Sequence, residues 1–474
     1  MNLERLAHSS EWLSPMIIKE LRQGLHSKLF ITFYLTLQGL LVLSALLMTT
    51  TPEYGSWLFW NTIGLTLLIA LPARGLVAIS LEIRAKTIEL IYLTKLSSLR
   101  IVLGKWGALF LQALLCAVAV LPYLLVRYLL GGEEIIFEFA KLLVILLFSA
   151  LCMAMTVSFS ALENWWGRGA MVAIAFSTLG ATLDFASPTI NPGAWVPGIL
   201  FLLTMGSLLT AISLYFGASL IATATDSHIA VLRVLCLAFC VVVPLAGLAT
   251  ENLLPAGLIS MAVLLLVCLS SLLGRTEPIS GNLRPFARLG ILGRPAAMLL
   301  SPGWASGLIY TLFLFTLIAL GLAVAYFLGA DLMLFSALFC AVSLLGAILV
   351  PLALIMLFQG EDAPRLLPFI WVQISMLFAT FFFNLMEDVL ESGTGAVGPI
   401  DLLALMPTAT LLLFLSPDQL APDEFFRFFA ANVAVTLVAA CFLLYRAGPE
   451  LRGLETLRQS FRQSLSALRS TATA

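Results

Sequence analysis

The sequence predicts an all-α polytopic membrane protein with about 12 transmembrane helices, short loops, amphipathic cytoplasmic helices and a re-entrant segment before the last span. Hydrophobic residues make up 61% of the 474 positions. Charged residues make up only 11%, whereas a soluble domain carries about 25%. Apolar runs of about 20 residues recur along the chain, and as helices each covers the roughly 30 Å of hydrocarbon in a bilayer.

By this length criterion the chain holds twelve spans, at 29–49, 57–79, 104–127, 142–162, 169–185, 195–222, 229–249, 253–273, 304–329, 332–358, 366–386 and 425–445. A further apolar run, 402–415, is shorter and contains Pro407. Between Glu387 and Glu424 the chain has seven acidic residues and no Lys or Arg. Both ends of the short run therefore belong on the same side, and we expect it to be re-entrant or interfacial.

Orientation follows from the tendency of Lys and Arg to stay cytoplasmic in short loops. With the N-terminus inside, the cytoplasmic segments hold 21 of the 25 basic residues. Counting 402–415 as a crossing would place the Arg-bearing C-terminal tail outside. We therefore expect a multi-pass protein of the cytoplasmic (inner) membrane of the cell, with both termini cytoplasmic.

The order of polar and apolar segments predicts five regions. They are a cytoplasmic amphipathic lead-in (1–28), an N-terminal transmembrane region of about eight spans (29–273), a cytoplasmic linker (274–303), a C-terminal transmembrane region of about four spans with the re-entrant run (304–446), and a cytoplasmic amphipathic tail (447–474). The linker contains four prolines and is the longest polar stretch between spans.

The lead-in and the tail each carry charge on an amphipathic pattern, which is typical of helices that lie along a membrane surface. Ser14 and Pro15 form a favourable helix start, because serine caps a helix and proline fits its first position. In the tail, leucines and one phenylalanine recur every three or four residues, with arginines on the remaining surface. Attraction to anionic cytoplasmic lipid explains the charge of this tail without a dedicated site.

A third charged segment, 81–105, connects spans two and three. As a helix it places Ile83, Thr87 and Leu90 on one side and sets Glu82 and Glu89 on another. Two interpretations stay open: a solvated loop helix whose charges hold the topology, or a surface that contacts a partner.

This connector resembles the permease subunits of type 2 ATP-binding-cassette (ABC) exporters. The matching residues are Glu82, Thr87, Glu89 and Leu90, then Leu93, Thr94, Leu96 and Ser97, then Ile101, Gly104 and Lys105. The lead-in Pro15–Arg22 is similar to the amphipathic helix of the same family, and the resemblance covers about the first 130 residues. Lys95 stands where the family usually has proline.

The resemblance implies that the connector rests on a phosphate-loop ABC ATPase subunit and transmits its closure. The ATPase-coupling segment then includes Glu82, Arg84, Thr87, Glu89, Lys95, Arg100, Gly104 and Lys105. It also implies a re-entrant element before the last span. Whether one chain forms the pathway, or two as a homodimer or with a second permease, stays open.

The chain itself has no phosphate loop of the form Gly-x-x-x-x-Gly-Lys-Ser/Thr. Gly104-Lys105 is followed by Trp106 and lacks the first glycine, since that position is Leu99. ATP hydrolysis is therefore expected on a separate subunit. We expect the chain not to be an enzyme and to carry no catalytic, cofactor or metal site.

An ion-coupled secondary transporter and a non-catalytic membrane scaffold are the alternatives. A secondary transporter is expected to place carboxylates near mid-membrane, but the four considered, Asp184, Glu251, Asp331 and Glu387, fall at predicted outer ends of spans. Arg74 is the one basic residue well within a predicted span, and it either has a functional role or extends to the cytoplasmic interface. Cys236 and Cys240 share a helix face without a third ligand, which disfavours a metal site. Nothing in the sequence indicates nucleic-acid binding.

Overall fold

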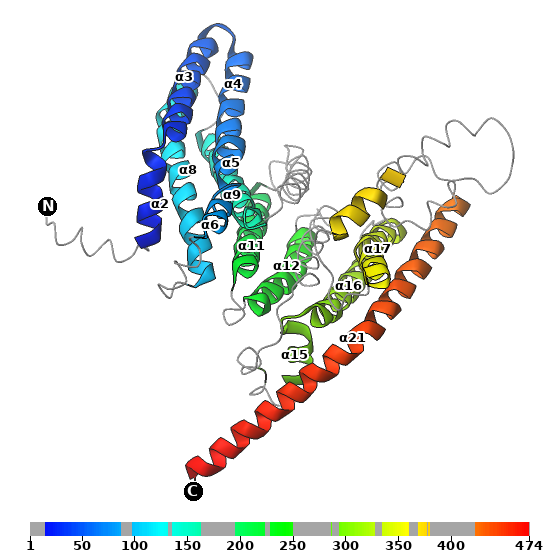
Figure 1. Cartoon of the computed structure of the whole chain (residues 1–474). Coiled ribbons are helices and arrows are strands. Elements are labelled where there is room, and N and C mark those ends of the chain that lie inside the picture. The colour runs from blue at the N-terminus through cyan, green and yellow to red at the C-terminus, as the bar shows by residue number, and fades with distance from the viewer. Residues whose placement is uncertain are drawn as a thin grey trace. The chain divides into compact units, whose positions relative to one another are not determined.

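The computed structural model describes residues 15–86, 97–130, 135–162, 195–222, 228–249, 286, 293–327, 334–359, 368–376, 378–379 and 422–473. All regular structure in these ranges is helical (Figure 1). The chain forms two compact units, one of residues 1–228 with 249–251, and one of residues 229–248 with 252–474.

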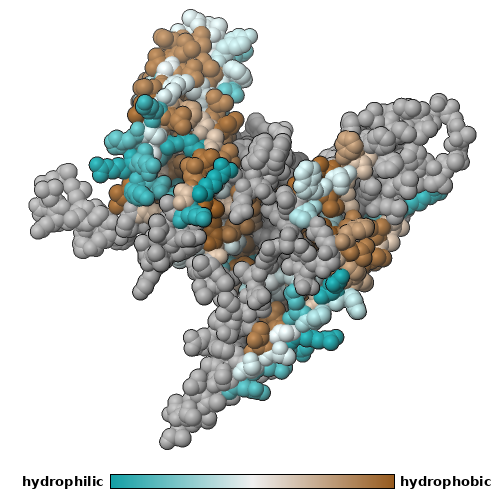
Figure 2. Space-filling model, viewed as in Figure 1, coloured by the Kyte–Doolittle hydropathy of each residue, from teal (hydrophilic) through white to brown (hydrophobic). Residues whose placement is uncertain are grey.

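Eight helices in the described ranges are long and apolar enough to cross a bilayer. They are Lys28–Thr50, Pro52–Arg84, Ser98–Leu129, Ile135–Phe159, Phe201–Ile221, Trp304–Gly321, Ala341–Phe358 and Arg427–Ser460. Large apolar side chains on these helices face outward, for example Leu35 at 63% exposure and Trp57 at 65%. Figure 2 shows this hydrophobic surface as brown atoms over helices α3 (Lys28–Thr50) and α4 (Pro52–Gly64). Such continuous apolar surface suits lipid and not water, so the chain is a multi-pass membrane protein.

Eight of the twelve predicted spans coincide with these helices. The predicted span 229–249 is also helical, as α12 (Ile229–Ala249). Of the predicted span 366–386, residues 368–376 are helical. The predicted spans 169–185 and 253–273 and the predicted re-entrant run 402–415 lie outside the described residues, so the count of about 12 remains a prediction.

The first unit contains nine described elements. They are α2 (Pro15–Leu25), α3 (Lys28–Thr50), α4 (Pro52–Gly64), the π-helix η1 (Leu65–Ala70), α5 (Leu71–Gly75), α6 (Ser80–Arg84), α8 (Ser98–Leu129), α9 (Ile135–Phe159) and α11 (Trp195–Ile221). The predicted helix start at Pro15 is confirmed. Between α2 and α3, Ser27 is extended and its Oγ accepts a hydrogen bond from the backbone N–H of Phe30 at 3.3 Å. The lead-in is thus a separate helix and does not run directly into the first span.

The second span is not one regular helix. Its middle is the π-helix η1, which lies directly before Leu71 and Pro72. Residues 76–79 then form turns between α5 and α6. Neighbouring α9 and the residue just after it supply partners to η1 and to these turns, since Ser149 Oγ donates to the carbonyl of Leu67 at 2.7 Å and Ser160 Oγ accepts from Ile79 N–H at 3.1 Å. Irregular backbone at membrane depth requires such internal partners, because lipid offers none.

The predicted continuous helix over 81–105 is wrong. Helix α6 ends at Arg84, and Lys86 has φ of 54°, in the left-handed region that terminates helices. Helix α8 starts at Ser98, after an extended Ser97. Residues 98–105 are therefore the first turns of the third span, and the connector proper is short.

The second unit contains α12, α15 (Gly293–Leu300), α16 (Trp304–Phe327), α17 (Leu334–Gln359) and α21 (Pro422–Thr473). Helix α21 has 52 residues, whereas a bilayer needs about 20. The predicted tail thus continues the helix of the last span through Pro449 and is not a separate element. Leu454 of this extension packs with Phe286 and with Ala297 of α15. The predicted region boundaries, including the linker 274–303, remain predictions.

Candidate functional site

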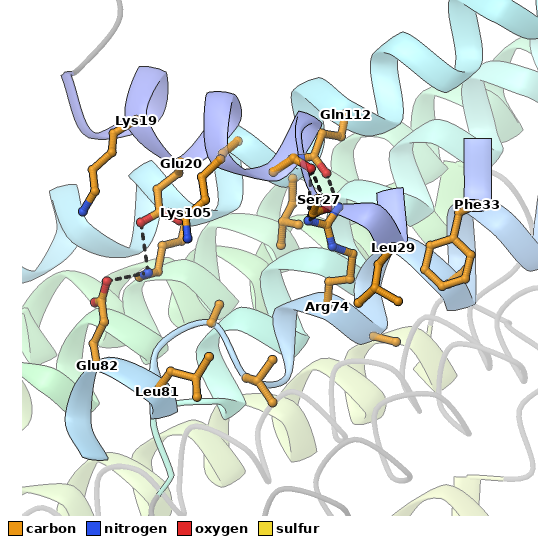
Figure 3. Close-up of a pocket in the computed structure, with 18 residues that line it drawn as sticks. Lys19, Glu20, Ser27, Leu29, Phe33, Arg74, Leu81, Glu82, Lys105 and Gln112 are labelled. Carbon is orange, nitrogen blue, oxygen red and sulfur yellow. Dashed lines mark hydrogen bonds and ion pairs between the residues drawn. The ribbon is translucent and has the colours of Figure 1, made fainter. Parts of the chain in front are cut away.

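A cleft of about 680 Å³ opens in the first unit where α2, α3, α5, α6 and α8 come together (Figure 3). Two polar clusters lie along it, one around Lys105 and one around Arg74. Between and beside them the lining is apolar and includes small residues such as Ala73, Ala78 and Ala108. The turns at 76–79 border the same cleft through Val77 and Ala78, so the irregular part of the second span faces it.

Lys105 is the centre of the first cluster. Its Nζ lies 2.8 Å from Oε1 of Glu82 and 3.3 Å from Oε1 of Glu20. The Lys105 side chain is only 5% exposed, while Glu82 and Glu20 are 17% and 22% exposed. A lysine this far from water needs paired carboxylates, because an uncompensated buried charge is strongly destabilising. The triad therefore fixes α2, α6 and α8 to one another.

The Lys105–Glu82 pair also brackets the connector. Glu82 lies on α6, which precedes the connector, and Lys105 lies in the first turns of α8, which follows it. Their contact brings the two ends of the connector together, and Glu20 adds the lead-in helix α2 to the same point. A displacement of the connector would therefore act on the second span, the third span and α2 together.

Arg74 is the centre of the second cluster. It donates hydrogen bonds to Oε1 of Gln112 at 2.5 Å, to Oγ of Ser27 at 3.1 Å and to the carbonyl of Gly24 at 3.5 Å. Its guanidinium lies 6.0 Å from the ring centroid of Phe30, within range of a cation–π interaction. Arg74 thus bridges the second span to α2, α3 and α8.

Glycines allow α2 to lie this close to α8. A Cβ on Gly104 would lie 2.9 Å from Cγ of Met16, and a Cβ on Gly24 would collide with the amide of Gln112. The Gly104-Lys105 pair of the sequence motif thus has a packing role and an ion-pairing role in the described structure.

The predicted coupling residues divide into three groups. Glu82 and Lys105 are brought together, and Gly104 packs on α2 beside them. Arg84 and Arg100 are exposed near the two ends of the connector. Thr87, Glu89 and Lys95 lie outside the described residues, so their predicted roles remain predictions.

Sequence analysis missed Glu20 and Gln112 as partners of these charges. The sequence spacing could have indicated Gln112, because it lies seven residues after Lys105 and this places both on one face of a helix. No sequence pattern indicated Glu20, because it is one of several charges in an amphipathic segment and its partner Lys105 is 85 residues away.

Further buried charges lie away from the cleft, and two of them are arginines that contact helix ends. In the first unit, Arg127 Nε lies 3.0 Å from Oε1 of the fully buried Glu138, joining the end of α8 to the start of α9. In the second unit, the fully buried Arg233 donates to the carbonyls of Leu299 at 2.6 Å and Ser301 at 2.8 Å. These carbonyls belong to the C-terminal end of α15 and the turn after it, where helices leave unsatisfied acceptors. Both arginines thus join helix ends.

The cleft offers paired ions, hydrogen-bonding groups and apolar walls, which suit binding and mechanical linkage. Comparison of the chain with protein-family models, curated proteins and solved structures gives no match. The residues and geometry of the chain itself are therefore the basis for inferring what it does.

Proposed function

We propose that this chain is the membrane-spanning permease subunit of an ABC transporter of the exporter type, energised by a separate phosphate-loop ATPase subunit. The observation that carries the proposal is the ion pair of Glu82 with Lys105 at the two ends of the connector. The connector is the segment in which the sequence resembles ABC permeases, and a partner that pushes on it would move two spans and α2 at once.

The proposal includes the finer topology. The chain has about 12 spans with a re-entrant run at 402–415, and it resides in the cytoplasmic (inner) membrane with both termini cytoplasmic. The connector then faces the cytoplasm, where ATP and the ATPase are available. The basic residues of the connector and tail support this orientation. A second copy of the chain or a second permease completes the pathway.

The first test is genetic and biochemical. We expect a phosphate-loop ATPase to be encoded next to this chain and to co-purify with it from membranes. Reversing connector charges, with Glu82→Lys and Glu89→Lys together, is expected to abolish co-purification and the stimulation of ATP hydrolysis by the permease.

Two further variants make this test specific. Glu89→Lys alone leaves the Glu82–Lys105 pair intact, so its effect reports on the connector and not on the triad. Glu53→Lys is the matched control, because Glu53 is an exposed glutamate in the first turn of α4, at the other end of the first span. Unchanged association and unchanged ATP hydrolysis in both connector variants would refute the proposal.

The alternative, an ion-coupled secondary transporter or a scaffold, makes the opposite genetic prediction. No ATPase would be encoded nearby, and transport or assembly would proceed without ATP. Failure to find any co-purifying ATPase would favour this alternative.

A further inference from the structure

The charges of the cleft do not balance. Its lining contains three cations, Lys19, Arg74 and Lys105, and two carboxylates, Glu20 and Glu82. Both carboxylates bind Lys105. Among the described residues, no carboxylate forms an ion pair with Arg74 or Lys19, so this part of the cleft carries excess positive charge.

Arg74 is half-buried, and within the described part of the chain its hydrogen-bond acceptors are neutral: the amide of Gln112, the hydroxyl of Ser27 and the carbonyl of Gly24. A guanidinium has five N–H donors in a planar fork that matches the oxygens of a phosphate. Basic pockets between transmembrane helices bind the headgroups of anionic lipids, and such a headgroup supplies the anion that this cation lacks within the described part of the chain.

The position of Arg74 indicates the source of that anion. Ser27, which Arg74 contacts, lies directly before the first span, Lys28–Thr50. The guanidinium is therefore at the level where this span begins, which is the headgroup level of a bilayer. From there, Leu29 and Phe33 extend the cleft wall along α3 (Figure 3), and Leu29 is 62% exposed.

We propose that the cleft binds the phosphate headgroup of an anionic phospholipid. Arg74 contacts the phosphate, Lys19 adds positive charge at the cleft, and an acyl chain lies along Leu29 and Phe33. This site is independent of the proposed coupling to an ATPase, since it needs only the bilayer. Bound lipid would connect α2 to the second span at the end of the cleft that the Lys105 triad does not occupy.

The test measures lipid binding by native mass spectrometry on the purified, delipidated full chain. Phosphatidylglycerol is expected to bind about tenfold more tightly than phosphatidylcholine. Arg74→Gln is expected to lower the affinity for phosphatidylglycerol about tenfold, the size expected for loss of one charge-assisted hydrogen bond. The matched control is Arg22→Gln, which removes an exposed arginine of α2 that does not line the cleft, and it should leave the affinity unchanged.

A second variant and a competitor distinguish a lipid from a free anion. Leu29→Gln alters the exposed apolar wall without touching Arg74, and it should weaken phosphatidylglycerol binding about threefold. Inorganic phosphate at millimolar concentration should displace little of the lipid. Equal binding of the two lipids, or no effect of Arg74→Gln, would overturn the proposal. Phosphate binding as tight as that of the lipid, with no effect of Leu29→Gln, would show a free-anion site and overturn the lipid assignment.

Discussion

Lys105 illustrates how a charge is accommodated inside a helix that is otherwise apolar enough to cross a membrane. Its ammonium is removed from water and is held between Glu20 and Glu82. Arg74 is held differently, by neutral acceptors from three elements. The two charges lie along one cleft, and the difference in their partners distinguishes the Lys105 triad from the lipid site proposed at Arg74.

Removing the Lys105 charge should destabilise the first unit. In Lys105→Met the carboxylates of Glu20 and Glu82 face each other without a cation. We expect the free energy of unfolding to fall by more than the value for an exposed ion pair, about 1 kcal/mol, and by less than that for a fully buried one, roughly 3–5 kcal/mol. The loss lies between these limits because both carboxylates keep some exposure. Thermal unfolding in detergent measures the loss.

The control for this variant is Arg100→Met, which removes an exposed charge from the first turns of the same helix. Adding Glu82→Gln to Lys105→Met should recover part of the stability, since it removes one of the two facing carboxylates. Equal melting of Lys105→Met and Arg100→Met would show that the triad contributes nothing to the fold.

At the scale of elements, the irregular second span depends on close packing against α9. The carbonyl of Leu67 and the N–H of Ile79 are satisfied by serine side chains of α9 or just beyond its end. Gly75 allows this approach, because a Cβ there would meet Oγ1 of Thr156 and lie 3.1 Å from its Cβ. The break in the second span is thus a packed feature that borders the cleft.

Gly75→Ala should therefore lower the melting temperature of the protein, although alanine is the better helix former by about 1 kcal/mol. Gly39→Ala in α3 is the matched control, since a Cβ at Gly39 meets nothing within 4 Å. We expect it to be neutral or stabilising. If both variants melt like the parent, α5 and α9 are less closely packed than described.

At the scale of the whole molecule, the chain is a multi-pass membrane protein whose first two candidate spans form a hairpin. Thr51 separates α3 from α4, and Pro52 begins α4. If both Lys28–Thr50 and Pro52–Arg84 cross the bilayer, the residues before the first and after the second lie on one side. The turn between them lies on the other.

Site-directed labelling tests this arrangement in a cysteine-free background. His26→Cys and Lys86→Cys should react with a membrane-impermeant maleimide from one side of sealed vesicles, and Tyr54→Cys from the opposite side. All three positions are exposed, so accessibility to the reagent is not limiting within the protein. Labelling of all three from the same side would contradict the crossing of these two helices.

The sequence by itself determined that the chain is helical, crosses a membrane many times and begins a helix at Pro15. These features depend on local composition, because apolar length sets a span and capping residues set a helix end. It also assigned Glu82 and Lys105 to one connector, but it treated that connector as a continuous helix, whereas Lys86 adopts a left-handed conformation.

Only the tertiary structure decided which charges meet. Glu20 and Lys105 are 85 residues apart, and Arg74 and Gln112 are 38 apart. Their contacts depend on how each helix is rotated about its axis and how closely glycines let α2 approach α8. Hydropathy along the chain contains no information on either quantity, so the cleft could not be predicted from the sequence.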